Sequence, residues 1–273
     1  MSPVDLLLVI LAVLLGAAAG PRISWSIRSW PGHEDLLEDY SKCPVCMGGL
    51  RRGCVNAGGR QDIAYLVFSA VLAGLSVGLW GVGTKALFSW MFGVSCMIIT
   101  VVDVRFLIIP DKLSINGSVA GLVYALACWI WTTPLGKAPP EQYVTLTDSL
   151  LGFALGGGFL WGLGWLAWKI LKKEGMGGGD VKLLAAFGAW LGWKPVIAIV
   201  VLASFLGSVG GIGNILYQKI KYRKQYKPLT HMIPFGPYLC VAFLFIFYFG
   251  MQPLFSLMDL YQGWVESRFL GNP

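Results

Sequence analysis

The sequence has few charged residues and almost no histidine. Asp, Glu, Lys and Arg make up 13% of the 273 residues, and only two histidines are present. An ordinary soluble domain has about 25% charged residues. Hydrophobic residues make up 56% and come in long blocks rather than at the periods of core-facing helices or strands. These features exclude an average water-soluble enzyme and predict an all-α protein of the lipid bilayer.

The chain also lacks a basic segment before its first apolar run, since no Lys or Arg precedes Arg22. That run is therefore predicted to be a membrane span rather than a secretory signal. A spanning helix needs about 20 mostly apolar residues. The sixth of the runs has only 13 residues, so a tilted helix, a re-entrant segment and one half of a helical hairpin all stay open for it. The eight predicted spans are residues 4–20, 62–82, 86–102, 114–133, 147–171, 181–193, 195–217 and 236–258.

Lys and Arg are distributed unequally between the two faces that eight spans would create. Seventeen fall on one face and four on the other. Cytoplasmic loops are enriched in Lys and Arg, so the first face is predicted to be cytoplasmic, with both termini on the opposite side. The bias explains the formal net charge of +7, and no nucleic-acid partner is expected. The predicted cytoplasmic face holds residues 21–61, 103–113, 172–180 and 218–235, with the adjoining helix ends.

The only predicted extramembrane segment of any size is residues 21–61. It separates a first membrane helix, residues 1–20, from a larger membrane part, residues 62–273. The segment contains a Cys-x-x-Cys pair and one further cysteine, and the pair has the spacing of two zinc ligands. We expect a small loop domain in which three thiolates hold zinc with a fourth ligand from elsewhere; the alternative is a reduced thiol pair without metal. The cysteines are Cys43, Cys46 and Cys54.

Two aspartates adjoin apolar blocks, where ionisable residues indicate a functional site. Asp103 ends the third predicted span and Asp180 precedes the sixth, so both are predicted at the cytoplasmic membrane face. Two carboxylates that share one proton can divide the work of an aspartic protease, one accepting a proton from water and the other donating to the scissile carbonyl. The sequence leaves open which of them holds the proton. The alternative is that each aspartate is a helix-end residue facing water, as expected for Asp111.

Glycines precede the second aspartate in the string Gly177-Gly178-Gly179-Asp180. Without side chains, Gly177 and Gly179 would let a substrate backbone approach Asp180, and they would permit a positive φ at the entry to the helix.

Three strings in the chain resemble a known family, the type IV prepilin peptidases, which are intramembrane aspartic proteases of the Gly-x-Gly-Asp class. The first is Asp103 followed by Pro110-Asp111, the second is KEGMGGGDVKLLAAFGAWLGW, and the third is IPFGPYL, from Ile233 to Leu239. The resemblance implies that Asp103 and Asp180 are the catalytic pair. It also implies cleavage of the short basic leader of prepilins and type II secretion pseudopilins at the cytoplasmic face of a bacterial inner membrane.

Longer members of that family also methylate the new N-terminal residue with S-adenosylmethionine and carry two Cys-x-x-Cys pairs in an extended loop. Here the loop is shorter and holds one pair with Cys54. The loop has no glycine-rich nucleotide string, so methylation and the methyl donor are left open.

The same loop contains four clustered acids in the string HEDLLEDY. On a helix, the four-residue spacing would stack them on one face. One interpretation is a solvated helix start. The other is a substrate-binding surface that attracts the basic leader. The acids are Glu34, Asp35, Glu38 and Asp39.

A rival hypothesis is a transporter or channel in which the two aspartates bind a cation or relay protons. It is disfavoured because both acids are predicted at one face rather than at the midplane, and because the sequence shows no repeat symmetry. Glu174 and Lys182 flank the Gly-x-Gly-Asp string and either orient Asp180 or anchor a helix end.

Overall fold

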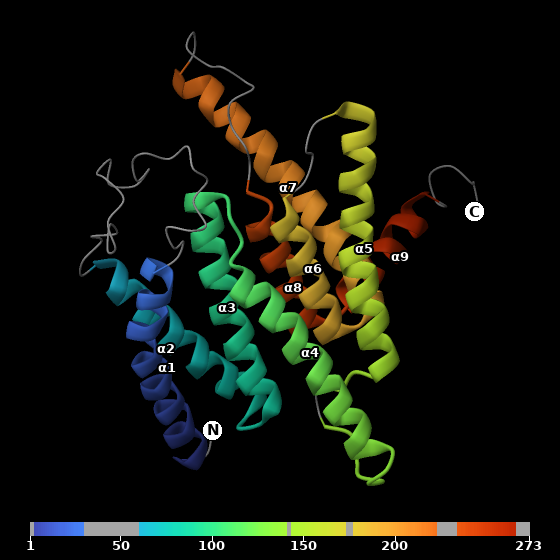
Figure 1. Cartoon of the computed structure of the whole chain (residues 1–273). Helices are drawn as coiled ribbons and strands as arrows, with labels where there is room; N and C mark the ends of the chain where they lie inside the picture. The colour runs from blue at the N-terminus through green and yellow to red at the C-terminus, as the bar shows by residue number, and fades with distance from the viewer. Residues whose placement is uncertain (1–2, 30–59, 141–142, 173–176, 223–233, 266–273) are drawn as a thin grey trace.

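The computed structural model describes residues 3–29, 60–140, 143–172, 177–222 and 234–265 (Figure 1). All regular elements within these residues are helices. They are α1 (Pro3–Ser29), α2 (Arg60–Trp80), α3 (Thr84–Phe106), α4 (Asp111–Thr132), α5 (Leu146–Leu171), α6 (Gly178–Leu191), α7 (Trp193–Tyr222), α8 (Gly236–Phe249) and α9 (Gln252–Val265).

Six of the described helices are long and apolar enough to cross a membrane: α1 to α5 and α7. Helices α8 and α9 pass the same test only as a pair, and they are bent by 93° at the break between them. The prediction of an all-α, multi-pass membrane protein is therefore confirmed.

The predicted number of eight spans is not confirmed, for two reasons. Helix α6 has 14 residues, which at 1.5 Å per residue is about 21 Å, against a hydrocarbon thickness of about 30 Å. The predicted last span, residues 236–258, is interrupted where Gly250 ends α8 with a φ of 68°. The first helix is longer than expected, because α1 continues through Pro21 to Ser29 instead of ending at residue 20.

Helix α6 is buried inside the bundle rather than facing lipid. Eight consecutive residues, Leu183–Trp190, are buried, which is typical of a helix surrounded by protein on all sides. It packs against α4, α5, α7 and α8. A helix too short to span the bilayer is thus held in place by its neighbours.

Glycines allow α5 and α6 to approach closely. A Cβ added to Gly156 would lie 2.5 Å from the carbonyl oxygen of Leu184, and one added to Gly152 would lie 2.6 Å from the carbonyl carbon of Gly192. The Ser149 hydroxyl donates a hydrogen bond of 2.6 Å to the carbonyl oxygen of Ala189. Small residues four positions apart and interhelical hydrogen bonds are the usual means of packing helices in lipid.

The opposite side of α6 meets α4 through a second glycine pair, Gly117 and Gly121. The indole Nε1 of Trp190 donates to the carbonyl oxygen of Gly117 at 2.9 Å. A Cβ on Gly121 would come within 3.0 Å of the Ala189 Cβ. The two contacts hold α6 at a defined depth between α4 and α5.

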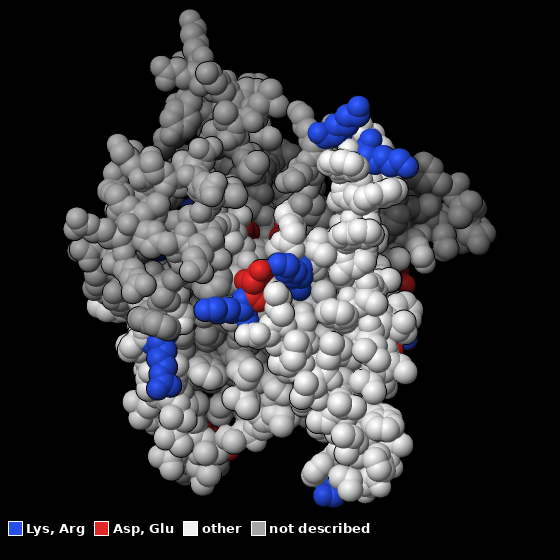
Figure 2. All heavy atoms as spheres, viewed as in Figure 1, with Lys and Arg blue, Asp and Glu red and all other residues white. Residues whose placement is uncertain are grey.

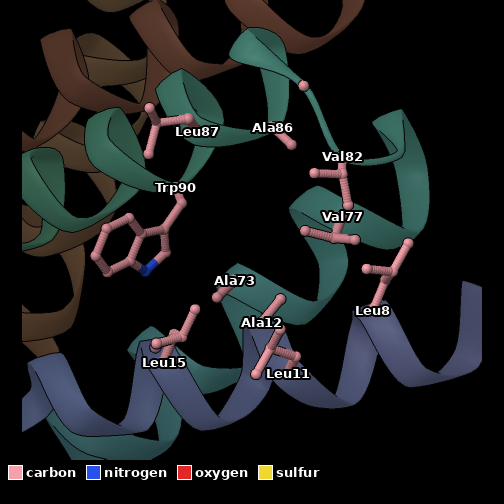
Figure 3. Close-up of a pocket in the computed structure, with 12 residues that line it drawn as sticks. Leu8, Leu11, Ala12, Leu15, Ala73, Val77, Val82, Ala86, Leu87 and Trp90 are labelled. Atoms are coloured by element: carbon pink, nitrogen blue, oxygen red, sulfur yellow. The ribbon is translucent and has the colours of Figure 1, made fainter.

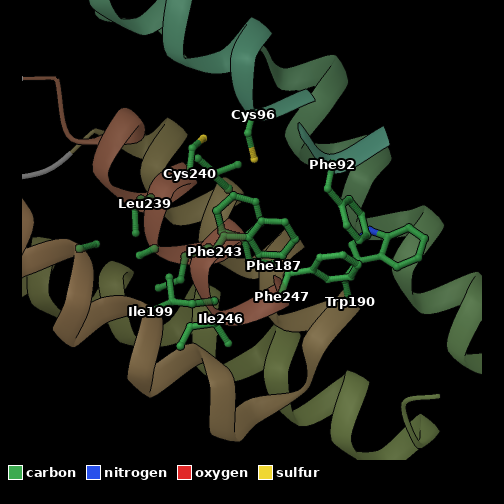
Figure 4. Close-up of a cluster of buried hydrophobic side chains, with 14 of the residues drawn as sticks. Phe92, Cys96, Phe187, Trp190, Ile199, Leu239, Cys240, Phe243, Ile246 and Phe247 are labelled. Atoms are coloured by element: carbon green, nitrogen blue, oxygen red, sulfur yellow. The ribbon is translucent and has the colours of Figure 1, made fainter. Parts of the chain in front are cut away.

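An aromatic cluster fills the space between α3, α6 and α8. The rings of Phe187 and Phe243 stack with centroids 4.0 Å apart, and Phe92 meets Trp190 edge to face at 5.0 Å. Such pairs add stabilisation beyond the burial of their area. The cluster therefore joins the three helices at whose ends the three family-like strings lie. Figure 4 shows these rings together with the buried aliphatic and cysteine side chains packed around them. The labelled residues are Phe92, Cys96, Phe187, Trp190, Ile199, Leu239, Cys240, Phe243, Ile246 and Phe247.

An apolar pocket lies between α1, α2 and the first turns of α3, lined in part by Leu15, Ala73 and Trp90 (Figure 3). No lining residue is charged. The part of α3 that lines it extends only to Trp90, about 20 Å along the helix axis from Asp103 at 1.5 Å per residue. The pocket is therefore separate from the two aspartates.

Substitution of Gly152 by alanine should destabilise the protein by about 1–3 kcal/mol, because the added methyl group would meet the backbone of α6, which cannot move aside. Gly158→Ala is the matched control on the same helix, since its Cβ would meet nothing within 4 Å. Thermal unfolding in detergent would compare the two. Equal unfolding temperatures for both variants would contradict the packing described for α5 and α6.

Candidate active site

Asp103 lies in the last turn of α3, and its side chain is buried, at 5% exposure. One carboxylate oxygen, Oδ2, accepts a hydrogen bond of 3.0 Å from the backbone N–H of Gly236. Gly236 is the first residue of α8, where backbone N–H groups have no partner within the helix. The start of α8 thus supplies a donor to a buried acid 133 residues away in the chain.

Asp180 is the third residue of α6 and is partly buried. Gly177 caps the helix with φ −70° and ψ 134°, and neither Gly178 nor Gly179 has a positive φ. The expectation that these glycines supply a positive φ is therefore wrong: the chain enters α6 from an ordinary extended conformation. The prediction that Asp180 opens a helix is confirmed.

Ile109 lies between the two aspartate-bearing regions. A Cβ on Gly179 would be 2.9 Å from the Ile109 Cβ, and a Cβ on Gly236 would be 3.2 Å from the Ile109 Cδ1 and 2.7 Å from Asp103 Oδ2. Both glycines are needed for this packing. The missing side chain of Gly179, predicted to admit substrate, makes room for Ile109, whereas Gly177 is exposed beside Asp180.

Gly236 has a position at the site that sequence reasoning did not assign. The string IPFGPYL contains it, and that string supported the family resemblance without suggesting any contact with Asp103. A glycine followed by proline at the start of an apolar helix is a helix-start signal. No local sequence pattern indicates that its N–H would bond to Asp103, which lies 133 residues earlier in the chain.

An ion pair joins the starts of α4 and α6. The Lys182 Nζ is 2.8 Å from both Oδ1 and Oδ2 of Asp111. Asp111 is the first residue of α4, as the helix-end interpretation predicted, but its carboxylate pairs with Lys182. Figure 2 shows acidic and basic side chains meeting near the middle of the face, with further basic side chains toward its edges.

Burial and the nearby charge of Asp103, in that order, raise the pKa of Asp180 to about 7, and the backbone N–H of Gly177 lowers it. Asp180 lies outside the six candidate spans. A like charge close to a carboxylate disfavours ionisation. The charge of Asp103 therefore favours the protonated form of Asp180.

This arrangement suits acid–base chemistry on a water molecule. A carboxylate that stays ionised can accept a proton, and a neighbour that holds one near pH 7 can donate it. Within the residues that the structure describes, no group of three or more His, Cys, Asp or Glu side chains could hold a metal ion.

The other predicted site residues lie outside the described residues. They are the acids Glu34, Asp35, Glu38 and Asp39, the cysteines Cys43, Cys46 and Cys54, and the flanking Glu174.

Comparison with known proteins places these motifs in a family. A family model described as "Type IV leader peptidase family" matches residues 90–212, a range that includes both aspartates and ends before Gly236. A prepilin leader peptidase/N-methyltransferase of Aeromonas salmonicida (strain A449) is 37% identical over 230 residues, covering 76% of this chain and 70% of that protein.

Two further relatives carry the same name. The protein of Xanthomonas campestris pv. campestris is 32% identical over 253 residues, 88% of this chain and 77% of that protein. The protein of Escherichia coli (strain K12) is 34% identical over 163 residues, 58% of this chain and 60% of that protein. No solved structure matches the chain significantly.

Replacing Asp103 by asparagine should lower the pKa of Asp180 from about 7, because the neighbouring negative charge is removed. The pH dependence of the carboxyl infrared band that disappears in Asp180→Asn would measure it. Asp148→Asn is the control, because Asp148 pairs with Thr145 at the start of α5. An unchanged titration of Asp180 in Asp103→Asn would show that the two carboxylates do not interact.

Proposed function

Because the chain belongs to the type IV leader peptidase family, we propose that it cleaves the leader peptide from prepilins or pseudopilins and methylates the N terminus so exposed. The relatives that match it are named for both activities. The rival hypothesis of a transporter or channel has no support among them.

The observation that carries the peptidase proposal is that Asp103, held by the Gly236 N–H, lies close enough to Asp180 on a separate helix for its charge to raise the pKa of Asp180. Asp103 and Asp180 are the catalytic residues. A water molecule between them attacks the scissile carbonyl carbon while one carboxylate takes its proton. The other aspartate donates its proton to the carbonyl oxygen, which gives a tetrahedral diol. Collapse of the diol breaks the C–N bond: one diol hydroxyl returns its proton to the aspartate that donated to the carbonyl oxygen, and the leaving amine takes the proton first removed from water.

The surroundings of the two acids favour one division of roles. The Gly236 N–H donates to Asp103, which stabilises the negative charge that a general base carries. Asp180, whose pKa is raised to about 7, holds a proton in a large fraction of molecules at neutral pH and is assigned as the general acid. Asp103 is therefore assigned as the base in the first step.

The active site is proposed to face the cytoplasm of a bacterial inner membrane. Supporting this, the end of α3 and the starts of α4, α6 and α8 meet one another, and the loops expected on that side are rich in Lys and Arg. Cytoplasmic loops carry that bias. A substrate whose helix remains in the membrane could then present its basic leader to the aspartates.

Recognition of the leader is assigned to Gly177 and to the acids Glu34, Asp35, Glu38 and Asp39. Gly177 leaves the side of Asp180 open, since its Cβ would lie only 3.3 Å from Asp180 Oδ2. The four acids carry charge opposite to that of a basic leader, and such charges raise association rates at low salt. This predicted surface lies in the segment between α1 and α2.

Methyl transfer requires S-adenosylmethionine as the donor of the methyl group to the new α-amino nitrogen. We assign no described residue to this cofactor. A zinc site at Cys43, Cys46 and Cys54 would stabilise the loop and takes no part in the peptidase steps.

Asp103→Asn and Asp180→Asn should each reduce prepilin cleavage by at least about 1,000-fold, because asparagine keeps the shape of the side chain but cannot exchange the proton. Cleavage of a prepilin with a basic leader by purified protein in lipid would measure the loss. Asp148→Asn, at the start of α5, should keep cleavage within about threefold of wild type. We call Asp103 and Asp180 the dyad. Substantial cleavage by either of the two dyad variants would remove that aspartate from the mechanism.

The dyad variants should also separate the two activities. Asp103→Asn and Asp180→Asn should fail to methylate an intact prepilin, because its α-amino group is not yet exposed, but should methylate a substrate supplied without its leader. Transfer of a labelled methyl group from S-adenosylmethionine to each substrate would measure this. Absence of methylation of the leaderless substrate by the wild-type protein would contradict the methyltransferase part of the proposal.

A further inference from the structure

The ion pair between Asp111 and Lys182 connects the two regions that carry the catalytic aspartates. Its partners are 71 residues apart in the chain, and the Lys182 nitrogen is 2.8 Å from both carboxylate oxygens. Lys182 follows Asp180 by two residues and is the fifth residue of α6. Asp111 begins α4, directly after the short connection from α3.

The connection from α3 to α4 begins in an unfavourable backbone conformation. Leu107 ends α3 with a φ of 55° and a ψ of 34°, a region that residues with bulky side chains rarely adopt. Such a conformation persists only when surrounding contacts hold it. The contacts here are Ile109, buried between Gly179 and Gly236, and the Asp111 carboxylate on Lys182.

The exposure of the pair indicates what it contributes. The side chains of Lys182 and Asp111 are 45% and 53% exposed, and ion pairs in water add little to folding stability. A contribution to folding stability therefore does not account for this contact of one ammonium with both carboxylate oxygens. The position of the ion pair accounts for the contact better, because the pair fixes α4 and the connection before it relative to the start of α6, which carries Asp180.

We propose that Asp111 and Lys182 are positioning residues, whose ion pair holds the connection Leu107–Pro110 against the start of α6 and so sets the separation of the Asp103 and Asp180 carboxylates. This inference rests on the proposed peptidase function. A misplacement of reacting groups by about 1 Å can reduce turnover by about 100-fold. The pair therefore acts on the rate of the chemical step rather than on the binding of substrate.

Four variants test the proposal by prepilin cleavage. Lys182→Ala and Asp111→Ala should each lower kcat by about tenfold or more, with KM changed by less than about threefold. The double alanine variant should be no slower than the worse single variant, because both changes break one interaction. The charge-swapped variant, Asp111→Lys with Lys182→Asp, should recover at least part of the lost kcat.

Lys194→Ala is the matched control. Lys194 is exposed near the opposite end of α6, with its ammonium 5.7 Å from the Trp193 ring centre, so the variant loses the same charge away from the dyad. It should keep the wild-type kcat. All five variants should unfold within about 4 °C of the wild type. An unchanged kcat in Lys182→Ala, an equal loss in Lys194→Ala, or additive losses in the double variant would overturn the proposal.

A second measurement does not depend on cleavage. Hydrogen exchange should become faster in Lys182→Ala at the amides of Leu107, Leu113 and Ser114, which bond to the carbonyl oxygens of Asp103 and Pro110, and should stay unchanged in Lys194→Ala. If the wild type does not cleave prepilin but exchange rises as expected, the peptidase proposal fails while the ion pair still holds the connection. If exchange does not rise, the positioning proposal fails.

Discussion

The close backbone contact between α5 and α6 is the constraint on which the rest of the structure depends. Helix α6, with 14 residues, is too short to be held by the bilayer as a span, yet it carries Asp180. Its depth must therefore come from its neighbours. Gly152 and Gly156 on one side and Gly117 and Gly121 on the other bring the adjoining helices into contact with it. In a bilayer, apolar side chains gain little by exchanging lipid contacts for protein contacts. Close packing therefore supplies much of the attraction between helices.

This packing allows the dyad to form from parts that are far apart in the chain. Asp103 comes from the end of α3, Asp180 from the start of α6, and the donor to Asp103 from the start of α8. The aromatic cluster of Phe92, Phe187 and Phe243 joins the same three helices, about two to three turns along each helix from the site. Buried ionisable groups are costly, so a site of this kind needs a rigid surrounding that keeps its few polar contacts in place.

Glycine has three separate uses around the site. At Gly179 and Gly236 it makes room for Ile109, and at Gly236 it also lets a backbone N–H reach Asp103. At Gly177 it leaves one side of Asp180 open. None of these positions uses a positive φ. The residue in the left-handed region nearest the site is Leu107, where contacts with the rest of the protein compensate for the unfavourable backbone.

The sequence by itself determined the class of protein and singled out the two aspartates as candidates for the site. Long apolar runs, few charges and two aspartates beside those runs predict a helical membrane protein with an acid pair, because hydropathy and the cost of a charge near lipid are local properties. The number of spans could not be read this way, because a buried 14-residue helix is as apolar as one that crosses the bilayer. Only the tertiary structure decided that Gly236 donates to Asp103, that Ile109 packs against Gly179 and Gly236, and that Asp111 pairs with Lys182. Each contact joins residues distant in the chain, and the depth and rotation of packed helices, which no local pattern encodes, decide which of them meet.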